Sequence, residues 1–318
     1  MGSFYFDLKD GIAVAHVLVN AAAYVAIIIL GYLLKRGGFF QVSDFRILSK
    51  IVLNITLPAA VIVNFSKLKL DFSLLSLIGV GLVCTLILVG IGYVLGKSQG
   101  PRAQAFNMQN FSGFNIGVFA LPFILNFVGP VGVAAICLFD VGNSLFVMGG
   151  TYALAATLLY KDEKFSWLLF LKTVLSSTTM VVYLVMTTMS LLHWKLPSEI
   201  LVFTDKIAVA NGFLAMLMIG IGFELNMERS QVARIGQALM VRLSFAALLA
   251  VLFYYVSPFS LEVRQALVLL AFSPIPASAT AFTAKLDGDI ALSSTLNSLA
   301  IVMSIVTMTG LLLVMDLA

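Results

Sequence analysis

The chain has 318 residues and a formal net charge of +4; 61% of its residues are hydrophobic and 11% are charged. Soluble domains contain about 45–50% apolar and about 25% charged residues, and a water-soluble chain of this length could not bury so much apolar surface. The composition therefore predicts an integral membrane protein. It also excludes a nucleic-acid-binding protein, because the Lys and Arg residues stand singly at the ends of apolar segments and form no basic helix.

Apolar segments long enough to cross a bilayer recur along the whole chain. A membrane-spanning helix needs about 20 apolar residues, and this window predicts ten helices with short connections, at 12–34, 44–65, 73–96, 103–126, 130–157, 166–191, 200–223, 231–256, 262–284 and 289–316. The first is interpreted as a helix rather than a signal peptide, because no small-residue cleavage site follows it. We therefore expect an all-α membrane protein; transmembrane β-strands would be about ten residues long with period two.

The basic residues predict the orientation of these helices. Thirteen Lys and Arg residues, among them Lys50 and Arg242, lie in or beside the loops that follow odd-numbered segments, and six lie on the opposite side. Because cytoplasmic loops carry the excess of Lys and Arg, we expect these loops in the cytoplasm and both termini outside it.

The two halves of the chain share a pattern in which corresponding features lie about 160 residues apart. Ser49–Asn54 in the second segment matches Asp205–Asn211 in the seventh, and the break at Ser112–Asn115 matches the one at Ser273–Pro276. Because five spans is an odd number, the second half must cross the membrane upside down relative to the first. The pattern predicts two inverted five-helix repeats, 12–157 and 166–316, an architecture that many secondary transporters use.

Polar and proline-rich stretches interrupt the fourth and ninth segments at mid-bilayer depth. The fourth contains Gly113 and Asn115, with Pro122 beyond them, and the ninth contains Pro274 and Pro276. Proline removes a backbone donor, and unwound backbone at this depth is tolerated only where protein or a water-filled cavity satisfies it. Two such helices in corresponding positions predict a binding site where they cross, with the N-termini of the following half-helices aimed at an anion. Prolines that merely kink packed helices are the alternative.

Polar side chains around the predicted crossing are the candidates for substrate binding. Asn115 can donate and accept at the first break, although Asn is also a strong helix cap. The other candidates are Gly113, Asn54, Thr56, Asn211, Ser278 and Thr280. The hydroxyls of Ser278 and Thr280 could instead bond back to their own helix. The predicted structural residues of the crossing are Pro58, Pro122, Pro274 and Pro276.

Asp140 is the one carboxylate that the predicted segments place near the bilayer midplane. A charge there costs at least about 2.5–3.5 kcal/mol, and such residues are usually functional. We therefore expect Asp140, with Asn143 one turn further on and Asn297 in the tenth segment, to couple a proton or a cation. The alternative is a structural role, in which Asp140 bonds the unwound backbone of the crossing.

Catalytic chemistry has no basis in the sequence. No Walker loop, HExxH, GxSxG or metal-ligand spacing is present. We therefore predict a protein that is not an enzyme and binds no metal or cofactor. The ion that could be coupled to transport is H⁺ or Na⁺. Lys50 and Lys206 lie one to two turns inside their segments and are expected to extend to the interface, with a role as counter-charge for an anion as the alternative.

Three motifs resemble those of a known family. Leu53–Ala59 is similar to the LN-x-x-LPA signature of the auxin efflux carrier family, Asn115 with Pro122 resembles the crossover element of its plant PIN members, and Pro276–Asp289 resembles the ninth helix and its following loop. The resemblance covers essentially the whole chain. It departs from the family in two respects: the long cytoplasmic loop of many plant carriers is absent, and Thr280 stands where many bacterial members carry Asn.

The resemblance implies a fold and an activity. The bile acid/auxin-type carrier superfamily has ten helices, with scaffold helices 1, 2, 6 and 7, transport helices 3–5 and 8–10, substrate bound beside the crossing, and a homodimer formed through the scaffold. We therefore expect a secondary active transporter or uniporter of a small organic anion in a prokaryotic inner membrane. The alternative is a sodium-coupled symporter of the bile-acid type. A membrane enzyme and a channel are the alternatives from other classes.

Overall fold

The computed structural model describes residues 2–41, 43–66, 72–125, 127–160, 167–225 and 228–315. Every regular element within these ranges is helical. The α-helices are α1 (Gly2–Arg36), α2 (Asp44–Ile51), α3 (Leu57–Ser66), α4 (Ser76–Gly96), α5 (Pro101–Phe111), α6 (Leu121–Ile124), α7 (Pro130–Leu145), α8 (Thr151–Leu159), α9 (Trp167–Leu175), α10 (Thr178–Leu191), α11 (Ser198–Ala208), α12 (Ala210–Gly222), α13 (Val232–Val251), α14 (Leu261–Ala271), α15 (Ser278–Lys285) and α16 (Ile290–Val314). π-Helical turns lie at Val52–Thr56, Ile116–Ala120, Phe146–Gly150 and Leu252–Val256. Four of the basic residues that were counted to predict the orientation lie outside the described ranges: Lys67, Lys69, Lys161 and Lys164. The predicted segment ends at 166 and 316 also lie outside them.

Seven helical stretches are long and apolar enough to cross a membrane: Leu18–Arg36, Asp44–Ser66, Phe72–Gln99, Pro130–Leu159, Ser198–Gly222, Val232–Val256 and Ile290–Val314. Each overlaps one of the predicted segments. The described chain therefore has the architecture of a multi-pass helical membrane protein, in agreement with the composition.

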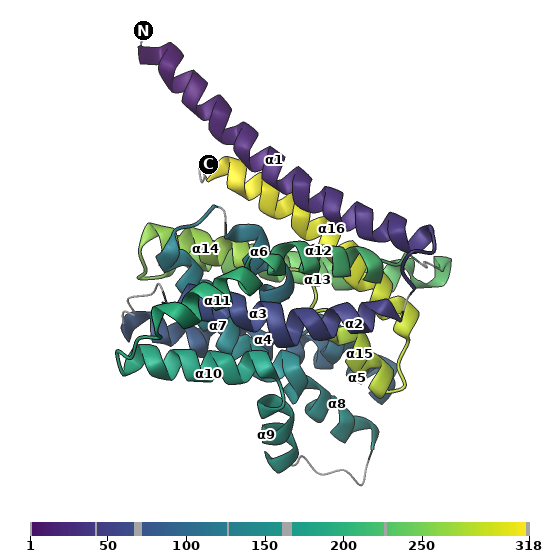
Figure 1. The fold of residues 1–318 in the computed structure, drawn as a ribbon. Helices are drawn as coiled ribbons and strands as arrows, with labels where there is room; N and C mark the ends of the chain where they lie inside the picture. Colours follow the sequence, from purple (N-terminus) through teal and green to yellow (C-terminus); the bar gives the residue numbers. More distant parts are fainter. Residues whose placement is uncertain are drawn as a thin grey trace.

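The other three predicted segments each consist of two shorter helices: α5 and α6, α9 and α10, and α14 and α15. The expectation of one continuous helix over 166–191 is wrong, because α9 turns away from α10 (Figure 1). The hydroxyl of Ser177 accepts a hydrogen bond from the backbone N–H of Met180 at 3.3 Å. Such a cap begins a new helix, which separates α10 from α9.

Contacts between the helices are densest within two groups. In one, α1 lies along α12, and α3 packs against α10 and α11. In the other, α4 packs against α5 and α7, α7 against α14, and α13 against α14 and α16. A Cβ atom at Gly142 would collide with the carbonyl of Ile78, so the glycine lets α7 approach α4 closely.

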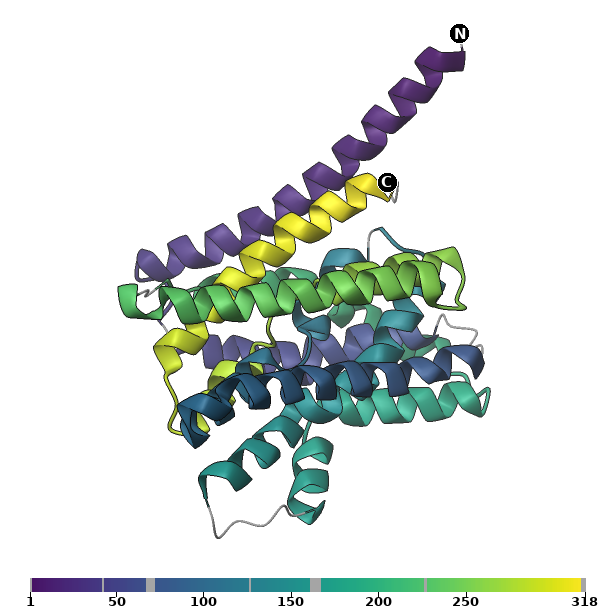
Figure 2. The same ribbon diagram turned by 180° about the vertical axis from the view of Figure 1, so that it is seen from behind.

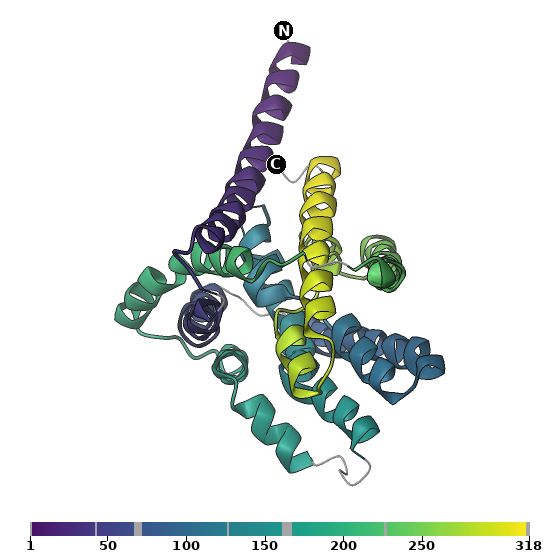
Figure 3. The ribbon, with the colours of Figure 1, turned by 90° about the vertical axis from the view of Figure 1, so that its right-hand side faces the viewer.

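Figure 2 shows α1 extending beyond the remaining helices at its N-terminal end, and Figure 3 shows several helices almost end-on.

The connections between helices define two opposite sides of the molecule. On one side, Lys35 Nζ at the end of α1 donates to the carbonyl of Phe223 at 2.7 Å, and Gln231 Nε2 donates to Asp289 Oδ2 at 3.0 Å. We name this the Lys285 side, because Lys285 ends α15 there.

The opposite side is named after Glu262, in the first turn of α14. Its Oε1 accepts a hydrogen bond from the backbone N–H of Gly132, in the first turn of α7, at 2.9 Å. The chain between α5 and α6 and the chain between α14 and α15 therefore both lie between the two sides.

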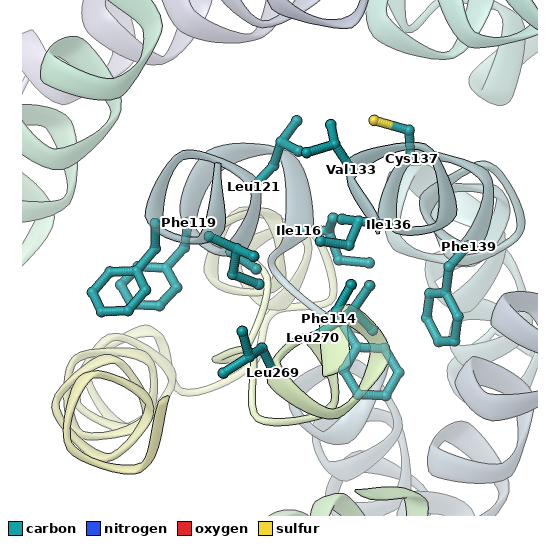
Figure 4. Close-up of a cluster of buried hydrophobic side chains, with 14 of the residues drawn as sticks. Phe114, Ile116, Phe119, Leu121, Val133, Ile136, Cys137, Phe139, Leu269 and Leu270 are labelled. Carbon is teal, nitrogen blue, oxygen red and sulfur yellow. The ribbon is translucent and has the colours of Figure 1, made fainter. Parts of the chain in front are cut away.

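An apolar cluster fills the space between α6, α7 and α14, toward the Glu262 side. Figure 4 shows Ile116 and Ile136 side by side, with Leu269 and Leu270 of α14 beneath them. These four side chains are buried, as is Phe119. The molecule is therefore densely filled beyond the interruption that follows α5.

Candidate functional site

Two interruptions in helices meet inside the molecule. α5 ends at Phe111 and is followed by non-helical backbone at 112–115, and α14 ends at Ala271 and is followed by non-helical backbone at 272–277. We name these the first break and the second break. The backbone N–H of Asn115 donates to the carbonyl of Pro274 at 3.0 Å. The two breaks, which the sequence predicts at these positions, are thus in direct contact.

The side-chain amide of Asn143, on α7, holds the first break. Its Oδ1 accepts from the backbone N–H of Phe114 and from Thr85 Oγ1, both at 3.0 Å. Its Nδ2 donates to the carbonyl of Phe114 at 3.0 Å and to Asp140 Oδ1 at 2.9 Å. The amide therefore uses all of its hydrogen-bonding capacity. It supplies the partner that the N–H of Phe114 needs, and the carbonyl of Phe114 also accepts from the backbone N–H of Ile116 at 3.0 Å.

Asp140 lies one turn before Asn143 and is 4% exposed. Besides the Asn143 amide, its carboxylate accepts hydrogen bonds from Ser144 Oγ at 3.2 Å and from the Tyr183 hydroxyl at 2.8 Å. All three partners donate to it. Because a carboxylate attracts the NH₂ group and not the carbonyl of an amide, Asp140 orients Asn143 for its contacts with Phe114. In the structural alternative that the sequence left open, Asp140 would bond the unwound backbone directly; in the structure it reaches that backbone through Asn143.

Arg242 is the other charged side chain that is buried within the described chain. The orientation argument places it beside a cytoplasmic loop, and this is wrong: Arg242 lies in the middle of α13 and is 5% exposed. Its Nη1 donates to the carbonyl of Phe111 at 2.7 Å, and its Nη2 donates to the carbonyl of Ser273 at 3.1 Å. The guanidinium also lies 5.9 Å from the centroid of the Phe114 ring. One side chain thus contacts both breaks.

A cavity of about 280 Å³ lies beside the breaks, and we name it the break cavity. The residues at the far end of each break line it, Ile116 and Gly117 on one side and Ala277 and Ser278 on the other. The N-terminus of a helix presents free N–H groups and the positive end of the helix dipole. Two half-helices therefore begin at this cavity, and the exposed Lys285 also lines it.

Asn115 contributes a free amide to the break cavity. Its backbone is used in the contact with Pro274, but its side chain makes no hydrogen bond to the described part of the chain. The side chain is 5% exposed and lines the cavity. The hydroxyl of Ser278, by contrast, donates to the carbonyl of Val147 at 3.1 Å. Asn115 is therefore the better placed of these two predicted residues to bind a ligand.

A second cavity of about 330 Å³ adjoins the break cavity and shares Asn115 and Met218 with it. Thr280 and Asn297 line this second cavity. Thr280 Oγ1 accepts a hydrogen bond from Ser293 at 3.1 Å, and Asn297 Oδ1 is buried without a partner in the described part of the chain. Asp140 and Asn143 line only the break cavity. The structure thus separates Asn297 from the two residues with which the sequence analysis grouped it.

Four of the predicted substrate residues line neither cavity: Asn54, Thr56, Gly113 and Asn211. Thr56 Oγ1 donates to Asn211 Oδ1 at 3.0 Å, which joins the start of α3 to α12. The exposed Asn54 donates to the carbonyl of Lys50 at 2.9 Å and accepts from Thr178 Oγ1 at 2.8 Å. The polar side chains among these residues are used in contacts within and between helices.

The remaining predicted residues lie close to the breaks or to helix bends. Gly113 has a φ of 67°, in the left-handed region that favours glycine. Pro276 lines the break cavity. Pro58 follows the π-helical turn at Val52–Thr56, and the carbonyl of Pro122 accepts a hydrogen bond from the Tyr24 hydroxyl at 2.8 Å.

Four residues at the site escaped the sequence analysis: Thr85, Tyr183, Arg242 and Lys285. Arg242 carried a usable signal, since a lone Arg within an apolar segment is costly and marks a functional or structural site. Thr85 and Tyr183 carried none, because hydroxyl side chains are common in membrane helices. Lys285 falls in the predicted connection between the segments 262–284 and 289–316, and only the course of α15 brings it to the cavity.

The described part of the chain contains no group of three or more His, Cys, Asp or Glu side chains that could together bind a metal ion. Comparison with known proteins gives no match, either to a family model or to a curated protein. The functional argument therefore depends on the geometry of the breaks.

Proposed function

We propose that the chain is a secondary active transporter or uniporter that moves a small organic anion across a membrane by alternating access at the two breaks. The observation that carries the proposal is the break cavity, which is lined by the first residues of two half-helices and by the free amide of Asn115. Backbone N–H groups at helix N-termini bind carboxylates without a dedicated basic residue. Lys285 provides an additional positive charge on the side where the cavity is exposed.

Contacts between corresponding positions support an inverted repeat. Asn115 contacts Pro274, and Thr56 contacts Asn211. Each pair joins residues that the predicted repeats place in equivalent segments, and two halves related by a pseudo-two-fold axis meet through equivalent segments near that axis. We infer ten spans on this basis, with α5–α6, α9–α10 and α14–α15 as interrupted ones.

The unequal filling on the two sides of the breaks supports alternating access. The break cavity extends to Lys285, whereas the Glu262 side of the first break is filled by the apolar cluster of Figure 4. A carrier in one of its two states is hollow on one side of its site and closed on the other. With the predicted orientation, the hollow side is cytoplasmic and both termini are outside a prokaryotic inner membrane.

The two helix groups support a division into scaffold and transport parts. One group contains α1, α3 and α10–α12, and the other contains α4, α5, α7 and α13–α16. This division corresponds to the one that the resemblance to auxin efflux carriers implies, and we carry that family over as part of the proposal, including a homodimer formed through the scaffold.

A sodium-coupled mechanism has less support at this site. The oxygens of Asp140 and the Oδ1 of Asn143 already accept hydrogen bonds. Sodium bound there would have to displace several of these donors, so the geometry favours an anion carrier without a cation held by Asp140.

A ligand screen on the purified protein tests the proposal. Mono-, di- and aromatic carboxylates are added one at a time, with and without sodium and at several pH values, and the thermal unfolding temperature is recorded. A ligand at 100 times its Kd stabilises the folded state by about 2.7 kcal/mol, which a thermal-shift assay detects. A carboxylate that stabilises the protein is then tested for uptake into proteoliposomes.

Two Asn→Ala variants locate the bound carboxylate. Asn115→Ala should abolish the stabilisation and the uptake while leaving the unfolding temperature without ligand almost unchanged. Asn54→Ala is the matched control, because Asn54 is exposed and lines neither cavity; it should retain both. Equal affinity in Asn115→Ala and the unmodified protein would remove Asn115 from the site, and uptake that continues without saturation would indicate a channel.

A further inference from the structure

Arg242 connects two helix ends that the chain itself does not connect. Its guanidinium donates to the carbonyl of Phe111, the last residue of α5, and to the carbonyl of Ser273, two residues after α14 ends. A helix leaves its last carbonyls without intrahelical partners. At a break within a membrane, water does not reach these groups freely, so a side chain has to satisfy them.

The charge of Arg242 has no carboxylate partner among the described residues: its contacts are the two carbonyls and the ring of Phe114. The C-terminus of a helix carries partial negative charge. α5 and α14 each have 11 residues and both end at this guanidinium. The last carbonyl of α5 and a carbonyl of the second break therefore take the place of a counter-ion, while the residues that begin the two half-helices beyond the breaks line the break cavity.

We propose that Arg242 is a positioning residue that fixes the two breaks to each other, so that the two interrupted helices behave as one unit. The direct link between the breaks is the hydrogen bond from Asn115 to Pro274. The guanidinium adds two charge-assisted bonds, and its planar fork reaches two acceptors at once, which an ammonium group on a shorter stem does not reproduce. This inference does not depend on the identity of a transported substrate.

Arg264 is a matched control in the same protein. Its Nε donates to the carbonyl of Phe259 at 2.7 Å and its Nη1 donates to the carbonyl of Tyr254 at 3.2 Å. It too joins two backbone carbonyls, but neither belongs to a break. A substitution of Arg264 therefore reports the general effect of removing such a side chain.

Amide hydrogen exchange, followed by mass spectrometry on the full chain in lipid nanodiscs, tests the proposal. In Arg242→Gln, exchange should accelerate by at least about tenfold over both 112–116 and 272–279, because hydrogen bonds to charged groups are among the stronger ones in proteins. Exchange over α4 should stay as in the unmodified protein. Arg264→Gln should accelerate exchange near 254–260 and leave both breaks unchanged. Arg242→Lys keeps the charge without the fork and should give intermediate protection.

Simultaneous acceleration at both breaks in Arg242→Gln, with partial rescue in Arg242→Lys, supports the positioning role. The proposal is overturned if one break responds without the other, if neither responds, or if Arg264→Gln produces the same pattern. If Arg242→Gln does not yield folded protein, Arg242→Lys is compared with Arg264→Gln under the same criteria. The outcome is independent of the carboxylate screen, so each proposal can fail without the other.

Discussion

The first and second breaks satisfy their unwound backbone in different ways. At the first break, the N–H and the carbonyl of Phe114 both bond to the side chain of Asn143, which comes from α7. At the second break, Pro274 and Pro276 have no N–H group to satisfy. The first break therefore depends on a partner from another helix, and the second depends largely on its own sequence.

This difference determines which residues each break is sensitive to. Asn143 is itself held by Thr85 of α4 and by Asp140, and Asp140 by Tyr183 of α10. A change on three different helices can thus disturb the first break. The second break has fewer side-chain supports, namely Arg242 at Ser273 and the hydroxyl of Ser278. Four predictions test this asymmetry, from the largest expected effect to the smallest.

The largest effect is expected for Asn143→Ala. It leaves the N–H of Phe114 and the buried hydroxyl of Thr85 without their acceptor and removes a donor from Asp140, whereas the carbonyl of Phe114 keeps the N–H of Ile116. Buried unpaired groups cost about 1–3 kcal/mol each, so the free energy of unfolding should fall by about 3–5 kcal/mol. Pro276→Ala at the second break should cost about 1–2 kcal/mol, because the unfolded chain gains freedom and the buried backbone acquires an N–H that proline does not present. Denaturant unfolding in detergent measures both. Equal losses would show that the two breaks are supported alike.

Gly113→Ala is expected to come next. The left-handed conformation of Gly113 costs an L-residue about 1–2 kcal/mol, and the added methyl group would collide with Val147 and approach Asn143 Oδ1 at 2.9 Å. Since overpacking costs about 1–3 kcal/mol, we expect a total loss of about 3 kcal/mol in the free energy of unfolding.

Gly38→Ala is the matched control for this change. Gly38 has a φ of 80°, but none of the described neighbours lies within 4 Å of the place that an added methyl group would take, so the substitution should cost only about 1 kcal/mol of backbone strain. Comparable losses for the two variants, measured by the same denaturant titration, would mean that the neighbours of Gly113 yield and that the first break is less rigid than its hydrogen bonds indicate.

The sequence predicted the positions of both breaks, and the reasons are local. Polar and glycine-rich residues at 112–115 and the prolines at 274 and 276 conflict with an apolar helix wherever they are placed, so they mark an interruption without any knowledge of the fold. The seven long apolar stretches were also predictable from local sequence, because length and hydropathy decide them.

The supports of the breaks were less predictable, because they depend on how helices distant in the sequence meet. Asn54, Thr56 and Asn211 are as polar as Asn115, yet they face other helices and line neither cavity. Arg242 was interpreted as a topology signal because its segment was known but its neighbours were not. To distinguish the residues that line the cavities from those that face other helices, one would have needed to predict how each helix is rotated about its own axis.

Asp140→Asn separates a positioning role from proton coupling at the first break. Asn keeps one acceptor oxygen but offers a donor where Asp140 accepts from Tyr183 or Ser144, so the free energy of unfolding should fall by about 1–2 kcal/mol. If Asp140 only positions Asn143, transport of the identified carboxylate in proteoliposomes should keep the pH dependence of the unmodified protein. A stable variant whose transport no longer varies with pH would instead assign the coupling proton to Asp140.

The smallest effect is expected for Ser278→Ala at the second break. The variant removes one hydrogen bond, from the hydroxyl of Ser278 to the carbonyl of Val147, and the free energy of unfolding should fall by about 0.5–1.5 kcal/mol. Ser66→Ala is the control, since Ser66 donates to the carbonyl of Val63 within its own helix at 2.8 Å and lies far from the breaks along the chain. If Ser278→Ala cost as much as Asn143→Ala, the second break would depend on a side chain from its own half-helix as strongly as the first depends on Asn143. The prolines would then no longer account for its stability, and the asymmetry between the two breaks would be lost. If Ser278→Ala instead lowers the free energy of unfolding by about as much as Ser66→Ala, the second break is stabilised by Pro274, Pro276 and Arg242.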